Sequence, residues 1–144
     1  MAPSSPQYPV ISSDTVVRPT QVEIDLDIIA ANLRAIRKKT APAAVMVILK
    51  ANAYGHGLVR IARLMQEAGA DYLGVAVLEE GILLRQQGIT MPVLVLGGIL
   101  GNQVPHFIEN DLTITASSID KLHQIEEAAA DMKARARVHL KVDT

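Results

Sequence analysis

Short apolar runs alternate with helical patterns along most of this chain, and the alternation constrains the fold more than any other feature. Five runs predict strands, at Ala44–Leu49, Tyr72–Val77, Val93–Leu96, Leu112–Thr115 and Arg137–Val142. Helical patterns separate them, from Leu58, over Glu79–Gln87, over Val104–Glu109 and from Ser117 or Ser118 to about Met132. Strands and helices that alternate in this way are typical of parallel sheets assembled from βαβ units. The sequence therefore predicts an α/β fold.

Two further elements are predicted before the helix that begins near Leu58. Val22, Ile24 and Leu26 alternate with polar residues, which is the pattern of a half-exposed strand. A helical stripe follows, made by Ile28, Ile29, Leu33 and Ile36, and Pro42 ends it. The next apolar run, Ala44–Leu49, is continuous and has the pattern of a strand buried on both faces.

Single residues mark the ends of the predicted helices. Gly69 and Gly88 stand where glycine commonly closes a helix. Ser117 or Ser118 is suited to cap the start of the long helix that follows. The element boundaries are therefore predicted from the sequence as well as the elements.

The pattern leaves two ways to close the sheet. One is an open doubly wound sheet and the other is part of an eight-stranded (β/α) barrel. The stretch Gly97-Gly98-Ile99-Leu100-Gly101 is not a dinucleotide-binding G-x-G-x-x-G fingerprint, and no Walker lysine follows it. Periodicity alone does not decide between the two.

Composition excludes several classes of protein. The 144 residues fit one domain, and a net charge of −1 gives no basic excess for binding nucleic acid. The chain has no cysteine, so a disulfide framework and a thiolate site are excluded. No apolar run approaches the length of a membrane span. Residues 1–19 are rich in Pro and Ser, so we expect a flexible arm before a folded region at 20–144.

The octet Lys50-Ala51-Asn52-Ala53-Tyr54-Gly55-His56-Gly57 carries the main chemical signal. Lys50 comes where an apolar strand runs out into a loop, so we expect its amine to be held in place and partly desolvated. Desolvation disfavours the ammonium form and lets the amine act as a nucleophile or base. The glycines permit a sharp turn, and the following helix offers free N–H groups to a phosphate. A lysine beside a phosphate cradle suits pyridoxal phosphate.

The octet resembles the cofactor-lysine motif of the alanine racemases, which are fold-type III pyridoxal-phosphate enzymes. The resemblance extends over about 20–144. It implies a (β/α) barrel of the TIM type, of which this chain would supply about the first five strands. The remaining strands and a C-terminal β domain would be missing, so we expect a fragment. In the family, the strand expected at Val22–Leu26 pairs with that second domain.

The resemblance also implies an activity, a compartment and an assembly. The expected reaction is the interconversion of L-alanine and D-alanine by two-base α-proton transfer, which supplies D-alanine for peptidoglycan in the cytoplasm. The expected assembly is a homodimer whose active sites draw on both subunits. The second base, a tyrosine, and an arginine that contacts the cofactor would lie beyond Thr144. We therefore expect the 144 residues alone to be inactive.

The resemblance assigns roles to individual residues. Lys50 would be the catalytic lysine that forms the Schiff base with pyridoxal phosphate, and Tyr54 would reach the phosphate. Ile48 and Leu96 would pack on the cofactor ring. Strand alternation directs Arg137, His139, Lys141 and Asp143 toward the barrel interior. The segment Lys141-Val142-Asp143-Thr144 resembles the family stretch whose lysine can be carbamylated, so the resemblance implies a carbamylated Lys141. The plainer interpretations are a solvent-facing Lys50, a packed loop tyrosine, ordinary core residues at Ile48 and Leu96, and a Lys141 that forms a salt bridge with Asp143 or a neighbour.

Other chemistries lack support in the sequence. The histidines have no metal-ligand spacing, and no G-x-S-x-G elbow appears. Glu79 and Glu80 are expected only to complement the dipole of a helix that they open. His56 is expected to brace its turn. Two alternatives remain open: a racemase for serine or lysine, and a non-catalytic carrier of pyridoxal phosphate on the same barrel.

Overall fold

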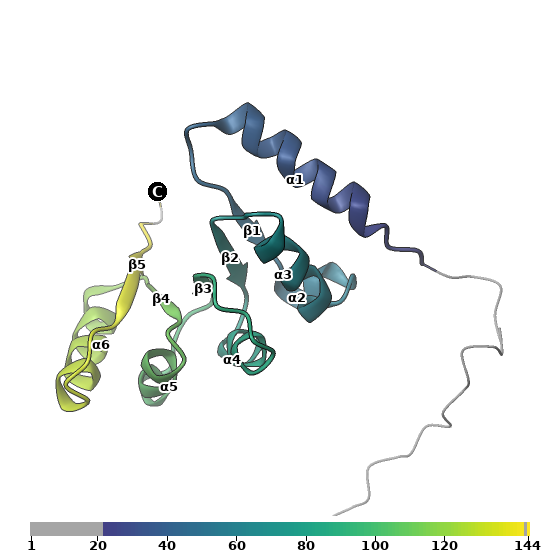
Figure 1. Ribbon diagram of the computed structural model, residues 1–144. Coiled ribbons are helices and arrows are strands. Elements are labelled where there is room, and N and C mark those ends of the chain that lie inside the picture. The colour runs from purple at the N-terminus through teal and green to yellow at the C-terminus, as the bar shows by residue number, and fades with distance from the viewer. Residues whose placement is uncertain (1–21, 143) are drawn as a thin grey trace, which may run out of the picture.

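The computed structural model describes residues 22–142 and 144, which form a curved parallel sheet with helices along one side (Figure 1). The strands are β1 (Met46–Ile48), β2 (Tyr72–Val75), β3 (Val93–Val95), β4 (Thr113–Ala116) and β5 (Arg137–Leu140). The helices are α1 (Leu26–Thr40), α2 (Lys50–Tyr54), α3 (Leu58–Glu67), α4 (Leu78–Gln86), η1 (Gly101–Gln103), α5 (Val104–Glu109) and α6 (Ile119–Asp131). All the helices and strands expected after residue 42 are confirmed, within a few residues at their ends. The arm expected at 1–19 lies outside the described residues.

The order of the strands decides how the sheet closes. The order is β1-β2-β3-β4-β5, and each strand pairs in parallel with the next one in the chain. A doubly wound sheet reverses its strand order at a switch point, and no reversal occurs among these strands. The sequential order and the curvature in Figure 1 are those of a (β/α) barrel. The fold is a partial TIM-type barrel.

The start of α1 corrects one expectation. Residues 22–25 are not a strand, and helix begins at Leu26. The side chain of Asp25 accepts hydrogen bonds from the backbone N–H groups of Asp27 at 2.9 Å and Ile28 at 3.0 Å. This is a helix N-cap, and it satisfies donors that the first turn otherwise leaves unpaired. A strand needs a neighbouring strand to pair with, and none of the described strands pairs with residues 22–25.

The other helix ends follow the expected rules. Ser118 caps α6 by accepting from the N–H of Lys121 at 3.2 Å. Gly69 and Gly88 follow α3 and α4 with φ angles of 81° and 82°, in the left-handed conformation that glycine adopts readily. The φ angles confirm both glycine predictions. The hydrogen bond identifies Ser118, and not Ser117, as the cap of α6.

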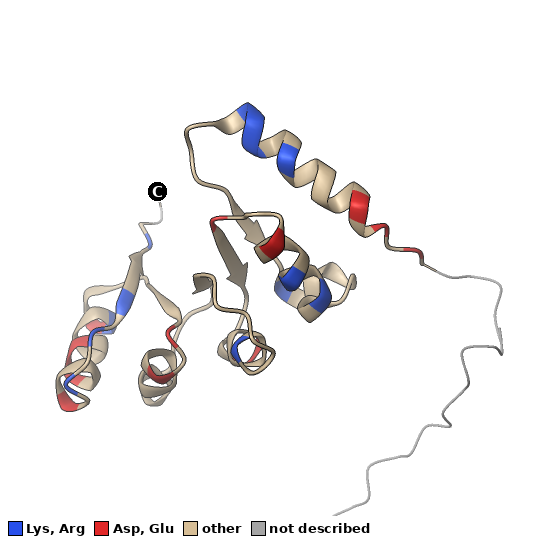
Figure 2. Ribbon diagram, viewed as in Figure 1, with Lys and Arg blue, Asp and Glu red and all other residues tan. Residues whose placement is uncertain are grey.

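The far end of α1 is anchored to the beginning of the sheet. Figure 2 shows basic residues gathered at its last turn, where positive charge complements the helix dipole. Arg37 contacts the Asp71 carboxylate at 2.7 Å, and the same oxygen accepts from the N–H of Val45 at 2.7 Å. The hydrogen bond from Val45 and the charge of Arg37 lower the pKa of Asp71 below its ordinary value. The anchor positions α1 beside β1.

The hydrophobic core lies between the sheet and its helices. The strands contribute one alternate set of residues, which is Leu73, Val75, Val93, Val95, Ile114 and Ala116. The helices contribute buried side chains such as Leu58, Ile61, Met65, Leu78, Leu84, Phe107 and Ile125. The edge strand β1 is only half-buried, so the expectation of burial on both faces is wrong for it. Helices cover one face of the sheet, and the described residues leave much of the opposite face at β1 open.

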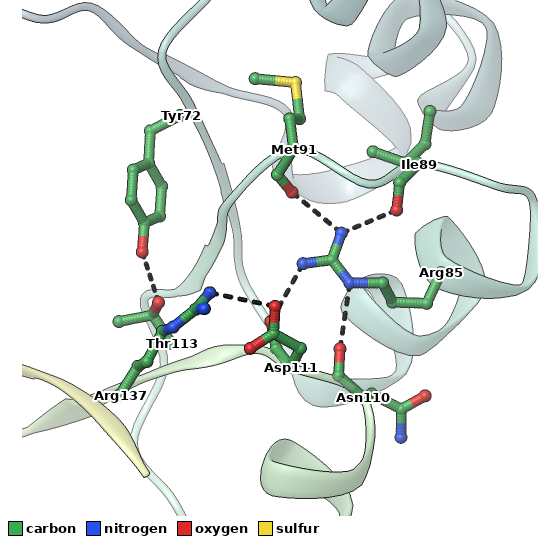
Figure 3. Close-up of polar contacts among 8 residues, drawn as sticks. All are labelled: Tyr72, Arg85, Ile89, Met91, Asn110, Asp111, Thr113 and Arg137. Carbon is green, nitrogen blue, oxygen red and sulfur yellow. Dashed lines mark hydrogen bonds and ion pairs between the residues drawn. The ribbon is translucent and has the colours of Figure 1, made fainter. Parts of the chain in front are cut away.

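Arg85, at the end of α4, joins the loops that lead into β3 and β4 (Figure 3). Its guanidinium donates to four backbone carbonyl oxygens, those of Ile89 at 2.8 Å, Met91 at 2.9 Å, Asn110 at 3.0 Å and Asp111 at 3.0 Å. The Asp111 carboxylate in turn contacts Arg137 at 3.0 Å. Partial burial lowers the pKa of Arg85. The cluster lies at the amino ends of the strands, so we assign it to stability, because barrel active sites lie at the carboxyl ends.

Candidate functional site

Lys50 lies two residues after β1, at the carboxyl end of the strand where barrel active sites lie. Its position at the strand end agrees with the prediction. Its environment does not, since the side chain is exposed rather than partly desolvated. A side chain is desolvated only where other residues cover it. Lys50 lies at the end of the edge strand β1, which the described residues cover only in part.

The backbone behind Lys50 forms a left-handed turn without glycine. Ala51, Asn52, Ala53 and Tyr54 have φ angles of 53°, 56°, 52° and 55°. Left-handed helical geometry costs an L-residue about 1–2 kcal/mol, because its Cβ approaches the following carbonyl oxygen. Runs of such residues persist only where surrounding contacts enforce them, and they cluster at functional sites. The sequence contained no sign of this conformation, which we had expected only at the glycines.

Asn52 organises the turn through its backbone and its side chain. Its carbonyl oxygen accepts from the N–H groups of Gly55 and Gly57, each at 3.0 Å. Its side-chain oxygen accepts from the N–H of Leu58 at 2.8 Å. The first N–H of α3 is therefore already bonded, so the helix offers a phosphate one donor fewer than expected. Asn52 was not predicted to have a role, although Asn side chains often hydrogen-bond to nearby backbone groups in turns and helix caps.

The remaining residues of the octet shape the turn as expected. Gly55 and Gly57 have φ angles of 90° and 95°, and a Cβ on either would meet no atom within 4 Å. Nδ1 of His56 lies 2.9 Å from the carbonyl oxygen of Ala53, so Nδ1 carries the proton and donates it. His56 thus braces the turn. Tyr54 is 60% exposed, so it is not packed in the core.

Gly74 brings Ile48 and Leu96 together on the sheet face opposite the helices. A Cβ on Gly74 would lie 2.6 Å from Cδ1 of Ile48 and 3.5 Å from Cδ1 of Leu96. The two side chains therefore meet over the bare backbone of β2, next to the strand end that carries Lys50. Their shared direction, predicted from strand parity, is confirmed. A glycine inside an apolar strand was the available signal for this close approach.

One row of this face crosses the whole sheet. The register aligns Ile48, Gly74, Leu94, Thr113 and Arg137. The row changes from apolar at β1 to polar at β5. On the same face the hydroxyl of Tyr72, from the row next to it, is hydrogen-bonded to that of Thr113, as Figure 3 shows.

Lys141 lies at the opposite edge of the sheet from Lys50. Its backbone N–H donates to the carbonyl oxygen of Ala116 at 2.8 Å, which continues the pairing of β5 with β4, and its side chain is exposed. The register places Arg137 opposite Thr113 and His139 opposite Thr115, as expected from the strand alternation. Asp143 lies outside the described residues. The structure therefore groups Lys50, Tyr54, Ile48 and Leu96 at one end of the sheet and leaves Lys141 apart from them.

The part of the chain that the structure describes contains neither a candidate metal site nor a helix that could span a membrane. It contains no group of three or more His, Cys, Asp or Glu side chains able to hold a metal ion. None of its helices has the length and apolar character required to cross a membrane.

Known proteins are similar to this chain in sequence and in structure. Residues 24–144 match the family described as alanine racemase, N-terminal domain. Alanine racemase 2 of Caldanaerobacter subterraneus subsp. tengcongensis is 42% identical over 129 residues, which are 89% of this chain and 33% of the relative. The solved alanine racemase of Clostridium difficile 630 in complex with cycloserine has a TM-score of 0.82 and 38% identity, over 90% of this chain and 35% of that one.

A solved histidine racemase from Leuconostoc mesenteroides is also similar, with a TM-score of 0.73 and 31% identity over 78% of this chain and 30% of that one. The chain thus spans about a third of the length of these relatives. Within that span the family model covers nearly all of the described residues. On the match of residues 24–144 to the family model, this chain belongs to the alanine racemase N-terminal domain family.

Proposed function

We propose that the natural polypeptide carrying this chain interconverts L-alanine and D-alanine with pyridoxal phosphate, and that Lys50 holds the cofactor. The observation that carries the proposal is the placement of Lys50 at the carboxyl end of β1, beside the apolar pair Ile48 and Leu96. Family membership supports the same reaction.

The residues at this end of the sheet fit the chemistry of pyridoxal phosphate. The cofactor requires an amine for its aldehyde, an apolar surface for its ring and donors for its phosphate. Nζ of Lys50 would hold the aldehyde, and Ile48 and Leu96 would form the surface over Gly74. The hydroxyl of the exposed Tyr54 would meet the phosphate, and Gly57 leaves room for it because a Cβ there would meet no atom within 4 Å.

Lys50 would also move a proton. When bound, pyridoxal phosphate draws electrons from the substrate and makes its α-hydrogen acidic. Once the amine of the substrate had displaced Lys50 from the aldehyde, the freed Nζ would take or return the α-proton on one face of the substrate. Inversion of configuration needs removal on one face and delivery on the other, which a single amine cannot perform. A second proton-transfer group, the tyrosine expected from a partner subunit, is therefore part of the proposal.

We further propose the wider setting implied by the family. The protein would act as a cytoplasmic homodimer and supply D-alanine for peptidoglycan. Lys141 would react as a neutral amine with carbon dioxide to form a carbamate and release a proton. Its exposed position after β5 leaves room for that addition. Labelled bicarbonate would then produce a carbamate carbon signal that a Lys141→Ala variant lacks.

Borohydride reduction followed by peptide mapping tests the cofactor assignment. The natural polypeptide should acquire a pyridoxyl group on Lys50 and racemise alanine, whereas Lys50→Ala should do neither. Lys38→Ala is the matched control, because Lys38 is an exposed lysine on α1 and not on the strand-end turn. An adduct on another lysine, or normal activity in Lys50→Ala, would contradict the assignment.

The amino acid itself is tested by a panel of substrates. Alanine should be racemised with a higher kcat/KM than serine, lysine or histidine. The similarity to a histidine racemase makes that comparison necessary. A Lys50 adduct without racemisation of any amino acid would instead indicate a carrier of pyridoxal phosphate.

A further inference from the structure

Glu80 connects the turn behind Lys50 to the neighbouring strand. It lies in the first turn of α4, and one of its carboxylate oxygens accepts from the N–H of Ala76, just after β2, at 2.8 Å. The other oxygen accepts from the N–H of Asn52 at 3.4 Å. One side chain thus spans the carboxyl ends of β1 and β2. Glu80 and Asn52 are 28 positions apart in the chain, so their hydrogen bond is a tertiary contact.

Asn52 is the residue through which this contact acts on the turn. Its carbonyl and side-chain oxygens already hold Gly55, Gly57 and Leu58, as described above. Those three contacts are local and would move with the turn if it rotated. The hydrogen bond to Glu80 differs, because Glu80 also binds the N–H of Ala76 and so links the turn to the end of β2. Together with the hydrogen bond from the Leu49 N–H to the Gly74 carbonyl oxygen at 2.7 Å, it therefore constrains the direction in which the chain leaves β1 at Lys50.

We propose that Glu80 is a positioning residue for Lys50, acting through Asn52; this role rests on the proposed function of Lys50. The carboxylate is suited to it, because two N–H donors need two acceptor oxygens and a carboxylate offers both. Glutamine offers one acceptor and one donor, so it can keep only one of the contacts. The left-handed turn then loses its tie to β2, and Nζ of Lys50 samples a wider range of positions.

The test compares Glu80→Gln with Glu79→Gln in the natural polypeptide. Both residues lie in the first turn of α4, so both variants lose the same charge from the same helix terminus. Glu79 is exposed and makes no hydrogen bond or ion pair with the turn. Amide hydrogen exchange of the cofactor-free protein reports the turn directly. The dissociation constant for pyridoxal phosphate, with kcat and KM for alanine, reports its consequence for Lys50.

Glu80→Gln should exchange faster over residues 51–57. It should bind pyridoxal phosphate about twofold to tenfold more weakly, the range expected from one partly exposed hydrogen bond. The kcat should fall more than KM rises, because alanine itself does not touch Glu80. Glu79→Gln should match the wild type. Glu80→Asp, which keeps both acceptors on a shorter stem, should restore part of the protection, and it remains informative if Glu80→Gln does not fold.

Two results would overturn the role of Glu80. One is exchange and cofactor affinity in Glu80→Gln equal to the wild type. The other is an equal change in Glu79→Gln, which would assign the effect to the helix dipole. Failure of the proposed function is recognised separately, as a wild-type protein that forms no adduct on Lys50. The exchange measurement needs no cofactor and keeps its meaning in that case.

Discussion

Replacing Ala51 with glycine should stabilise the protein, although the same change in an ordinary helix destabilises it. Ala51 has φ 53° and ψ 55°, and its side chain is exposed. Removing the methyl group relieves a conformational cost of about 1–2 kcal/mol. Glycine also gains freedom in the unfolded chain, which opposes the effect by about 0.4–1 kcal/mol. The net expectation is a gain of about 0.5–1 kcal/mol in the free energy of unfolding, from these two terms.

Ala35→Gly is the matched control. Ala35 is exposed in the middle of the right-handed helix α1, so the change removes the same methyl group and again buries or exposes little apolar surface. There glycine should cost about 0.5–1 kcal/mol. The two variants should thus move in opposite directions, by about 1–2 kcal/mol relative to one another.

Urea unfolding of the natural polypeptide measures this difference. With a slope of about 2 kcal/mol per molar urea, the two midpoints should differ by about 0.5–1 M. The slope itself should not change, because neither substitution alters the surface exposed on unfolding. Equal destabilisation by Ala51→Gly and Ala35→Gly would refute the reasoning. It would mean that the turn behind Lys50 is not strained at Ala51, and that its geometry is not enforced by tertiary contacts.

Two further predictions concern the packing beneath the site. Gly97→Ala should destabilise the protein by about 1–3 kcal/mol, because its Cβ would lie 2.5 Å from the carbonyl oxygen of Ala76, a backbone atom that cannot rotate away. Gly98→Ala meets nothing within 4 Å, so thermal unfolding should rank it at or above the wild type, and the reverse ranking would contradict the steric argument. Arg85→Lys should cost about 1–3 kcal/mol, because an ammonium group cannot reach four carbonyl oxygens in the fork geometry of a guanidinium. Arg60→Lys, on an exposed residue of α3, should leave the urea midpoint unchanged, and an equal loss in both would show that the carbonyl contacts contribute nothing.

The fold was predictable from the sequence to the extent that its determinants are local. Apolar periodicity placed the helices and strands, and residues such as Ser118 and Gly69 marked their ends by capping chemistry. The prediction of a strand at residues 22–26 was wrong, and the cause is again a local interaction. The pattern alternated, but Asp25 formed a better local contact as a helix cap.

The candidate site was predictable only in part. Lys50 stood out because the octet combines a strand end with glycines, Tyr54 was assigned only by the resemblance of the octet to the family motif, and the shared face of Ile48 and Leu96 followed from strand parity. The role of Gly74 and the contacts of Asn52 and Glu80 were not predicted. Each depends on residues brought together from different strands or loops, and no pattern within one segment reports such a meeting.

The sequence by itself determined the types of the elements expected after residue 42, the helix ends at Ser118, Gly69 and Gly88, the position of the strand-end lysine and the family. These are properties of short segments, in which neighbours within a turn or a strand decide the outcome. Tertiary structure alone decided the strand order that closes the sheet as part of a barrel, the exposure of Lys50 and the left-handed turn behind it. Strand order and exposure depend on contacts between distant residues. A left-handed run of non-glycine residues is unfavourable locally, so only contacts from elsewhere in the fold can maintain it.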